Sequence, residues 1–91
     1  MIRLVEVIKS LTGYQLEEVY INPEHVVAMR QDNRMVSVMK EGLLPEGLNS
    51  AQGFTKLYVD RGHTGIDITV VGDIQHIKEK LGINAKTLLK G

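Results

Sequence analysis

The residues with the clearest chemical potential form one small cluster around a predicted turn. Asp60, His63 and Asp67 fall within eight residues, and glycines bracket the turn between them. A zinc site built without cysteine needs several histidine or carboxylate ligands from different elements. The spacing of this cluster follows no metal-binding motif, and the two aspartates are equally suited to stabilising the turn. The sequence therefore predicts no metal site and no cofactor.

The sequence gives no better support for nucleophilic catalysis or for a phosphate-binding loop. The chain has no cysteine, and Ser10, Ser37 and Ser50 lie in no nucleophile-elbow context. The glycines between residues 42 and 53 are widely spaced and lack the Gly-Lys-Ser/Thr ending of a phosphate-binding loop. We expect a protein that is not an enzyme.

The basic residues suggest one alternative function, the binding of nucleic acid. Residues 26–30 and 35–40 are predicted to be the third and fourth strands, joined by a turn at Gln31-Asp32-Asn33-Arg34. Arg30, Arg34 and Lys40 would then line one hairpin and contact phosphates. The chain as a whole has eleven basic and eleven acidic residues and no clustered basic run, so nucleic acid is not the favoured partner. A nucleic-acid-binding regulator remains the alternative function.

The elements that must position these residues are organised around residues 19–30. Two short apolar runs flank Asn22-Pro23-Glu24-His25. Proline has no backbone N–H and disfavours a helical conformation in the residue before it. We expect a strand, a tight turn and a second strand, folded back on each other.

Other segments alternate in the same way. Residues 2–11 fit a strand or a helix, and their four valine and isoleucine residues favour the strand. Residues 14–21, Phe54–Asp60 and 66–71 also predict strands. After Gly72, Asp73 can cap a helix whose Ile74, Ile77 and Leu81 form an apolar stripe, and Gly82 ends it.

These patterns predict a mainly β (α+β) fold. We expect a curled antiparallel sheet or small barrel of about six strands, with one short C-terminal helix. Residues 1–82 would form a single small domain, and residues 83–91 a tail.

Leucines without an obvious place in this core suggest the leading function. Residues 41–53 contain three glycines and a proline, and carry Leu43, Leu44 and Leu48. This loop is either a lid on the sheet or an interface. The tail adds Leu88 and Leu89. We expect a non-enzymatic binding or adaptor module that forms a homo-oligomer and binds another protein.

The amino-acid composition indicates the cellular compartment in which we expect the protein. The absence of cysteine favours a reducing environment, and no apolar run approaches the ~20 residues that span a bilayer. We expect a cytoplasmic protein with no membrane partner.

A family resemblance starts from residues 20–29, Tyr-Ile-Asn-Pro-Glu-His-Val-Val-Ala-Met. With Met1-Ile2-Arg3-Leu4 and the helix start Val71-Gly72-Asp73-Ile74, this segment resembles the FlbD-like small flagellar and swarming-motility proteins. The resemblance covers roughly half of the chain. The first hairpin, the loop 41–53 and the tail 83–91 are longer than in that family. The resemblance implies an accessory role without catalysis.

Overall fold

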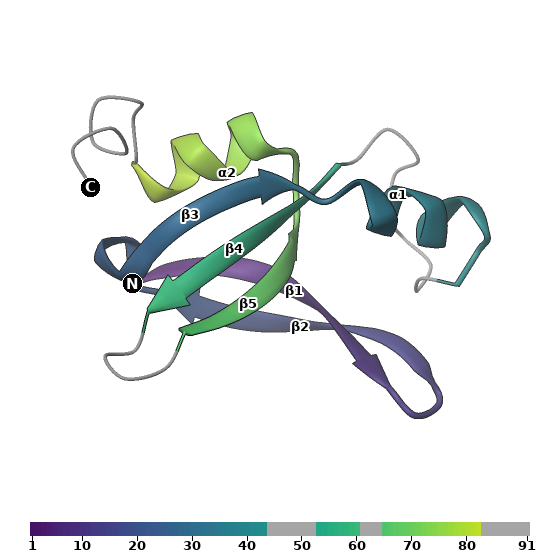
Figure 1. The fold of residues 1–91 in the computed structure, drawn as a ribbon. Helices are drawn as coiled ribbons and strands as arrows, with labels where there is room; N and C mark the ends of the chain where they lie inside the picture. Colours follow the sequence, from purple (N-terminus) through teal and green to yellow (C-terminus); the bar gives the residue numbers. More distant parts are fainter. Residues whose placement is uncertain (44–52, 61–64, 83–91) are drawn as a thin grey trace.

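The computed structural model describes residues 1–43, 53–60 and 65–82, and Figure 1 shows their arrangement. The strands are β1 (Ile2–Ser10), β2 (Gly13–Ile21), β3 (Val26–Gln31), β4 (Phe54–Asp60) and β5 (Gly65–Val71). The helices are a single 3₁₀ turn, η1 (Pro23–His25), and two α-helices, α1 (Asn33–Lys40) and α2 (Ile74–Leu81).

The five strands form one antiparallel sheet in the order β2-β1-β5-β4-β3. β1 and β2 pair along their whole length, from Ile2 opposite Ile21 to Ser10 opposite Gly13. β1 meets β5 only at Glu6 opposite Val70 and at the next pair along the strands. Beyond Val7 the β1–β2 hairpin has no pairing with β5, and its turn end therefore diverges from β4 and β5 (Figure 1). The sheet is not closed, and the predicted α+β fold with a mainly antiparallel sheet is confirmed.

α2 covers one face of the sheet and completes the core (Figure 1). Asp73 caps the helix by accepting a hydrogen bond from the His76 N–H at 2.8 Å, and Gly82 ends it in the left-handed region at φ 70°. The predicted helix is thus confirmed, and its side chains Ile77 and Leu81 are buried. The buried cluster comprises Leu4, Ile21, Val26, Leu57, Val59, Val70, Ile77 and Leu81.

Along β4, side chains point alternately to the face of the sheet that α2 covers and to the opposite face. Thr55, Leu57 and Val59 are buried under α2, whereas Lys56 and Tyr58 are half-buried on the other side. The sequence predicted this alternation. It places a lysine and a tyrosine on the sheet face that α2 does not cover.

The segment predicted to be the fourth strand is instead helical. α1 spans Asn33–Lys40, so the prediction of strand for residues 35–40 is wrong. The Asp32 carboxylate caps the helix by accepting from the Met35 N–H, and Met35 and Val38, three residues apart, share one face of the helix. The described sheet thus has five strands, not six, and the described residues contain a second α-helix.

The predicted turn at Pro23 is partly wrong as well. The chain is extended on both sides of it, as expected, but β2 and β3 are not paired and lie at opposite edges of the sheet. Pro23 opens η1, where the Asn22 side chain accepts from the Glu24 N–H at 3.0 Å. A 3₁₀ turn redirects the chain without reversing it, so η1 carries it from one sheet edge to the other.

No helix in the described part of the chain is long and apolar enough to cross a membrane.

Candidate binding groove

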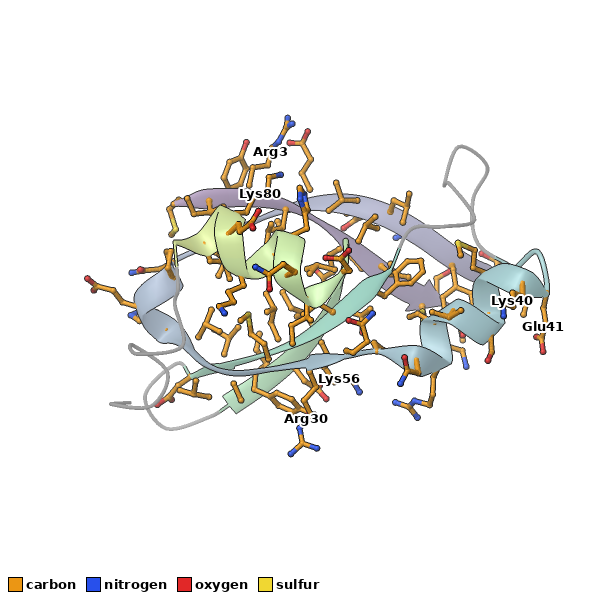
Figure 2. The ribbon with its side chains drawn as sticks, turned by 90° about the horizontal axis from the view of Figure 1, so that it is seen from above. Arg3, Arg30, Lys40, Glu41, Lys56 and Lys80 are labelled. Atoms are coloured by element: carbon orange, nitrogen blue, oxygen red, sulfur yellow. The ribbon has the colours of Figure 1, made fainter. Side chains whose placement is uncertain are left out.

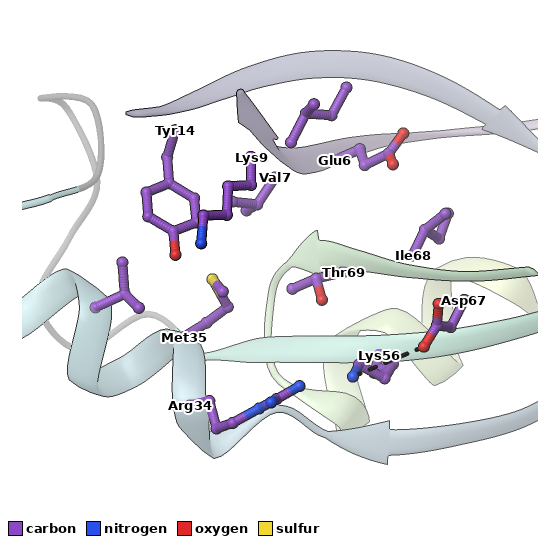
Figure 3. A pocket seen from close by; sticks show the side chains of 12 residues that line it. Glu6, Val7, Lys9, Tyr14, Arg34, Met35, Lys56, Asp67, Ile68 and Thr69 are labelled. Carbon is purple, nitrogen blue, oxygen red and sulfur yellow. Dashed lines mark ion pairs between the residues drawn. The ribbon is translucent and has the colours of Figure 1, made fainter. Parts of the chain in front are cut away.

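A groove of about 510 Å³ lies on the sheet side opposite α2. The diverging β1–β2 hairpin forms one wall, α1 forms the other, and β4 and β5 form the floor (Figure 3). We call it the hairpin groove. Its walls and floor are lined by Glu6, Val7, Ile8, Lys9, Tyr14, Arg34, Met35, Val38, Lys56, Asp67, Ile68 and Thr69.

The α1 wall is fixed by the hydrogen bonds of one buried residue, Asp32. Asp32 is only 6% exposed, and its Oδ1 accepts from the Met35 N–H at 3.3 Å. Its Oδ2 accepts from the Thr69 hydroxyl at 2.8 Å, and its backbone N–H donates to the Phe54 carbonyl at 2.8 Å. These hydrogen bonds fix the start of α1 against both β4 and β5. Because Arg34 lies in the first turn of α1, they also fix its position beside the groove.

The hairpin wall presents Lys9 and Tyr14. These two residues lie directly opposite each other in the β1–β2 register, so their side chains share one face. At the hairpin end the Ser10 hydroxyl donates to the Gly13 carbonyl at 3.0 Å. Figure 3 shows Lys9 and Tyr14 pointing into the groove, with Arg34 and Met35 entering from the opposite wall.

The groove is lined by three cationic side chains, Lys9, Arg34 and Lys56, and by two acidic ones, Glu6 and Asp67. Lys56 Nζ lies 3.8 Å from the Asp67 carboxylate, and this pair is only partly exposed on the lysine side. Among the described residues, neither Lys9 nor Arg34 forms an ion pair. Two cationic side chains are therefore available to a ligand, and a third is shared with Asp67.

A second hollow of about 250 Å³ adjoins the hairpin groove, and we call it the side hollow. Arg34 and Lys56 line both, and the side hollow adds Arg30 and Tyr58. Arg30 and Lys56 are cross-strand partners in the β3–β4 register and lie close together in Figure 2. The two hollows therefore form one continuous recess with four cationic side chains.

A carboxyl group lies at the other end of the groove. Burial raises the pKa of the Glu6 carboxyl above its ordinary value of 4.5, and the Glu17 carboxylate opposite it on β2 raises the pKa further. Figure 3 places Glu6 at the end of the groove away from Tyr14. Glu6 thus lies apart from Lys9 and Arg34 along the groove, whereas Asp67 lies beside Lys56.

The three basic residues predicted from the sequence do not all lie together. Arg30 and Arg34 line the side hollow, but they do so from a strand and a helix, not from one hairpin. Lys40 lies beside Glu41 at the far end of α1 (Figure 2). The prediction that Lys40 shares their surface is wrong, because the helical turn of α1 carries it away from the sheet.

The sequence analysis missed four cationic or aromatic lining residues: Lys9, Tyr14, Lys56 and Tyr58. The alternation of β4 contained part of the signal, since it placed Lys56 and Tyr58 on one face. The approach of the hairpin to α1 has no local signal.

The remaining predicted site residues are only partly described. Leu43 is 53% exposed, whereas Leu44, Leu48, Leu88 and Leu89 lie outside the described residues. His63 also lies outside them. Within the described ranges, no group of three or more histidine or acidic residues could hold a metal ion.

No family model matches the chain, and no curated protein or solved structure matches it either. The resemblance to the FlbD-like proteins accordingly remains a sequence-based expectation.

Proposed function

We propose that this protein is a non-enzymatic binding module that holds an anionic partner in the hairpin groove. The observation that carries the proposal is the convergence of Lys9, Arg34 and Lys56 from three separate elements on one recess. The proposal agrees with the accessory, non-catalytic role that the FlbD-like resemblance implies. The absence of cysteine favours a reducing compartment, so we place the binding in the cytoplasm.

The lining of the groove suits an anion that also has an apolar part. Guanidinium and ammonium groups make charge-assisted hydrogen bonds to phosphate or carboxylate oxygens. Val7, Met35 and Val38 supply apolar surface beside them. The lining thus combines apolar side chains with polar groups that can fix the orientation of a ligand, a combination typical of binding sites.

Binding of a small polyanion tests the proposal directly. We expect inorganic tripolyphosphate, titrated into ¹⁵N-labelled protein at low salt, to shift the amide signals of Lys9, Arg34 and Lys56. Arg34→Gln should weaken this binding several-fold. Lys40→Gln removes the same charge from the same helix, away from the groove, and should bind as the wild type does. Equal affinities for the two variants, or no shifts at low salt, would contradict the proposal.

Self-association is a second candidate, supported by exposed apolar side chains. Leu43 is half-exposed beside α1, and Met1, Tyr20, Val27 and Ile66 are exposed at strand ends. A homo-oligomer or a protein partner would remove such side chains from water. Size-exclusion chromatography with light scattering tests this candidate. A strictly monomeric protein at micromolar concentration would count against it.

A further inference from the structure

We infer that the anionic partner is single-stranded nucleic acid, held along the hairpin groove and the side hollow together. The inference rests on the proposed function and adds the class of ligand. It follows from the continuity of the recess, from the placement of two tyrosines and from the charge of the residues between them.

The recess is longer than one anion requires. Arg34 and Lys56 line both hollows, Lys9 lies on the hairpin side of them, and Arg30 lies on the β3 side. Successive phosphates of a flexible backbone can therefore meet cations from Lys9 to Arg30, and along this path the Asp67 carboxylate is paired with Lys56. A single phosphate would engage only the centre of this path. An extended polyanion matches it better.

Each hollow also contains one aromatic ring. Tyr14 lines the hairpin groove and Tyr58 lines the side hollow, and both side chains are half-buried. Each ring projects from a paired strand, so its position is fixed by the sheet. A positively charged groove with aromatic rings for stacking is the arrangement by which proteins bind single strands without sequence preference.

The same features disfavour a duplex. Bases in a duplex are stacked on their neighbours, so their faces are not available to rings set in a recess. The chain has no net charge, so it lacks the broad positive field that draws proteins to duplex DNA. An acidic peptide would use the cations but would have no use for two stacking rings.

Fluorescence anisotropy with a labelled oligodeoxythymidine of about twelve nucleotides tests the inference. We expect binding at low salt that weakens as salt is raised. With three to four phosphate contacts on a single strand, the slope of log affinity against log salt should be about −2 to −3. An unlabelled duplex and a poly-glutamate peptide serve as competitors, and both should compete poorly.

Three variants separate charge from stacking. Arg34→Gln should weaken binding and make the slope shallower by about 0.7, because one phosphate contact is lost. Tyr58→Leu should weaken binding by about ten-fold and leave the slope unchanged, because stacking releases no counterions. Lys40→Gln should behave as the wild type. Unfolding curves of all three variants confirm that the fold is retained.

The outcomes distinguish this inference from the proposed function. If tripolyphosphate binds and the oligonucleotide does not, the inference fails and the proposed function stands. If neither binds, both fail. Equal competition by poly-glutamate or by the duplex, or wild-type affinity in Tyr58→Leu, would also overturn the inference.

Discussion

Replacement of Asp32 by alanine should destabilise the protein and disable the hairpin groove. Asp32 is buried, and its two carboxylate oxygens accept from the Met35 N–H and from the Thr69 hydroxyl. Loss of a helix N-cap costs about 1 kcal/mol. Loss of a hydrogen bond to a charged acceptor costs about 1.5–3 kcal/mol. Removing a buried carboxylate also recovers part of its desolvation cost, so we expect a net loss of about 2–3 kcal/mol.

Urea unfolding followed by circular dichroism measures this loss. Thr69→Val removes only the second hydrogen bond and should cost about 1–2 kcal/mol. Because the two side chains contact each other, the double variant should lose less than the sum of the single losses, by about 1 kcal/mol. A loss below about 0.5 kcal/mol in Asp32→Ala, within the range of ordinary surface changes, would refute the reasoning. Strict additivity would refute the role of the Asp32–Thr69 bond.

Anion binding by the same variants distinguishes position from charge. Asp32 places a negative charge close to Arg34, so the loss of its Coulomb repulsion towards an anion would by itself make Asp32→Ala bind tripolyphosphate more tightly. If the cap instead holds Arg34 in place, Asp32→Ala binds more weakly. Asn caps a helix as well as Asp does. We therefore expect Asp32→Asn, which loses the charge and keeps the cap, to bind at least as tightly as the wild type, and Asp32→Ala to bind more weakly.

The remaining predictions concern the core and one titrating group. Ile77→Ala should cost about 2–5 kcal/mol in urea unfolding, because the fully buried side chain would leave a cavity under α2, whereas the half-buried Ile74→Ala should cost less. Gly72→Ala should cost more than about 1 kcal/mol, because Gly72 has φ +125° and a Cβ there would lie 3.0 Å from Ile77 Cδ1; a wild-type melting temperature would contradict this. The raised pKa of Glu6 means that the folded state binds its proton more tightly than the unfolded state does, so this group adds stability as pH falls from neutral through the raised pKa towards 4.5. The free energy of unfolding of Glu6→Gln, measured against pH over that range, should lack this gain, and an unchanged pH dependence would contradict it.

The parts of the fold that the sequence predicted depend on local signals. α2 follows from Asp73 at its start, Gly82 at its end and a buried stripe between them, all within ten residues. The strand β4 follows from side-chain alternation, which the burial of Leu57 between Lys56 and Tyr58 reproduces. Such elements carry their own caps and periodicity, so neighbours in sequence suffice to define them.

The parts that the sequence did not predict depend on distant contacts. The valines of residues 35–40 favour a strand by propensity. The Asp32 cap of α1 is itself local, but the sequence analysis assigned Asp32 to a turn, and the second hydrogen bond that holds its carboxylate comes from Thr69, 37 residues away. η1 separates two strands that local rules would pair, and β3 instead pairs with β4, which lies more than twenty residues further along the chain. The hairpin groove also depends on contacts between distant parts of the chain, because its cations Lys9, Arg34 and Lys56 are far apart in the sequence. No local pattern brings them together.

The division of the sheet into two faces allows stability and binding to be changed separately. The buried cluster that includes Leu4 and Val70 packs against Ile77 of α2, whereas the cations of the recess lie on the opposite side and contribute little buried apolar surface. Exposed or partly exposed ion pairs contribute at most about 1 kcal/mol, so even the Lys56–Asp67 pair has a small role in stability. Neutralising Arg34 should therefore change the free energy of unfolding by no more than about 0.5 kcal/mol. A binding defect in that variant then reports on the recess itself, and a large loss of stability would mean that the recess is part of the structural core.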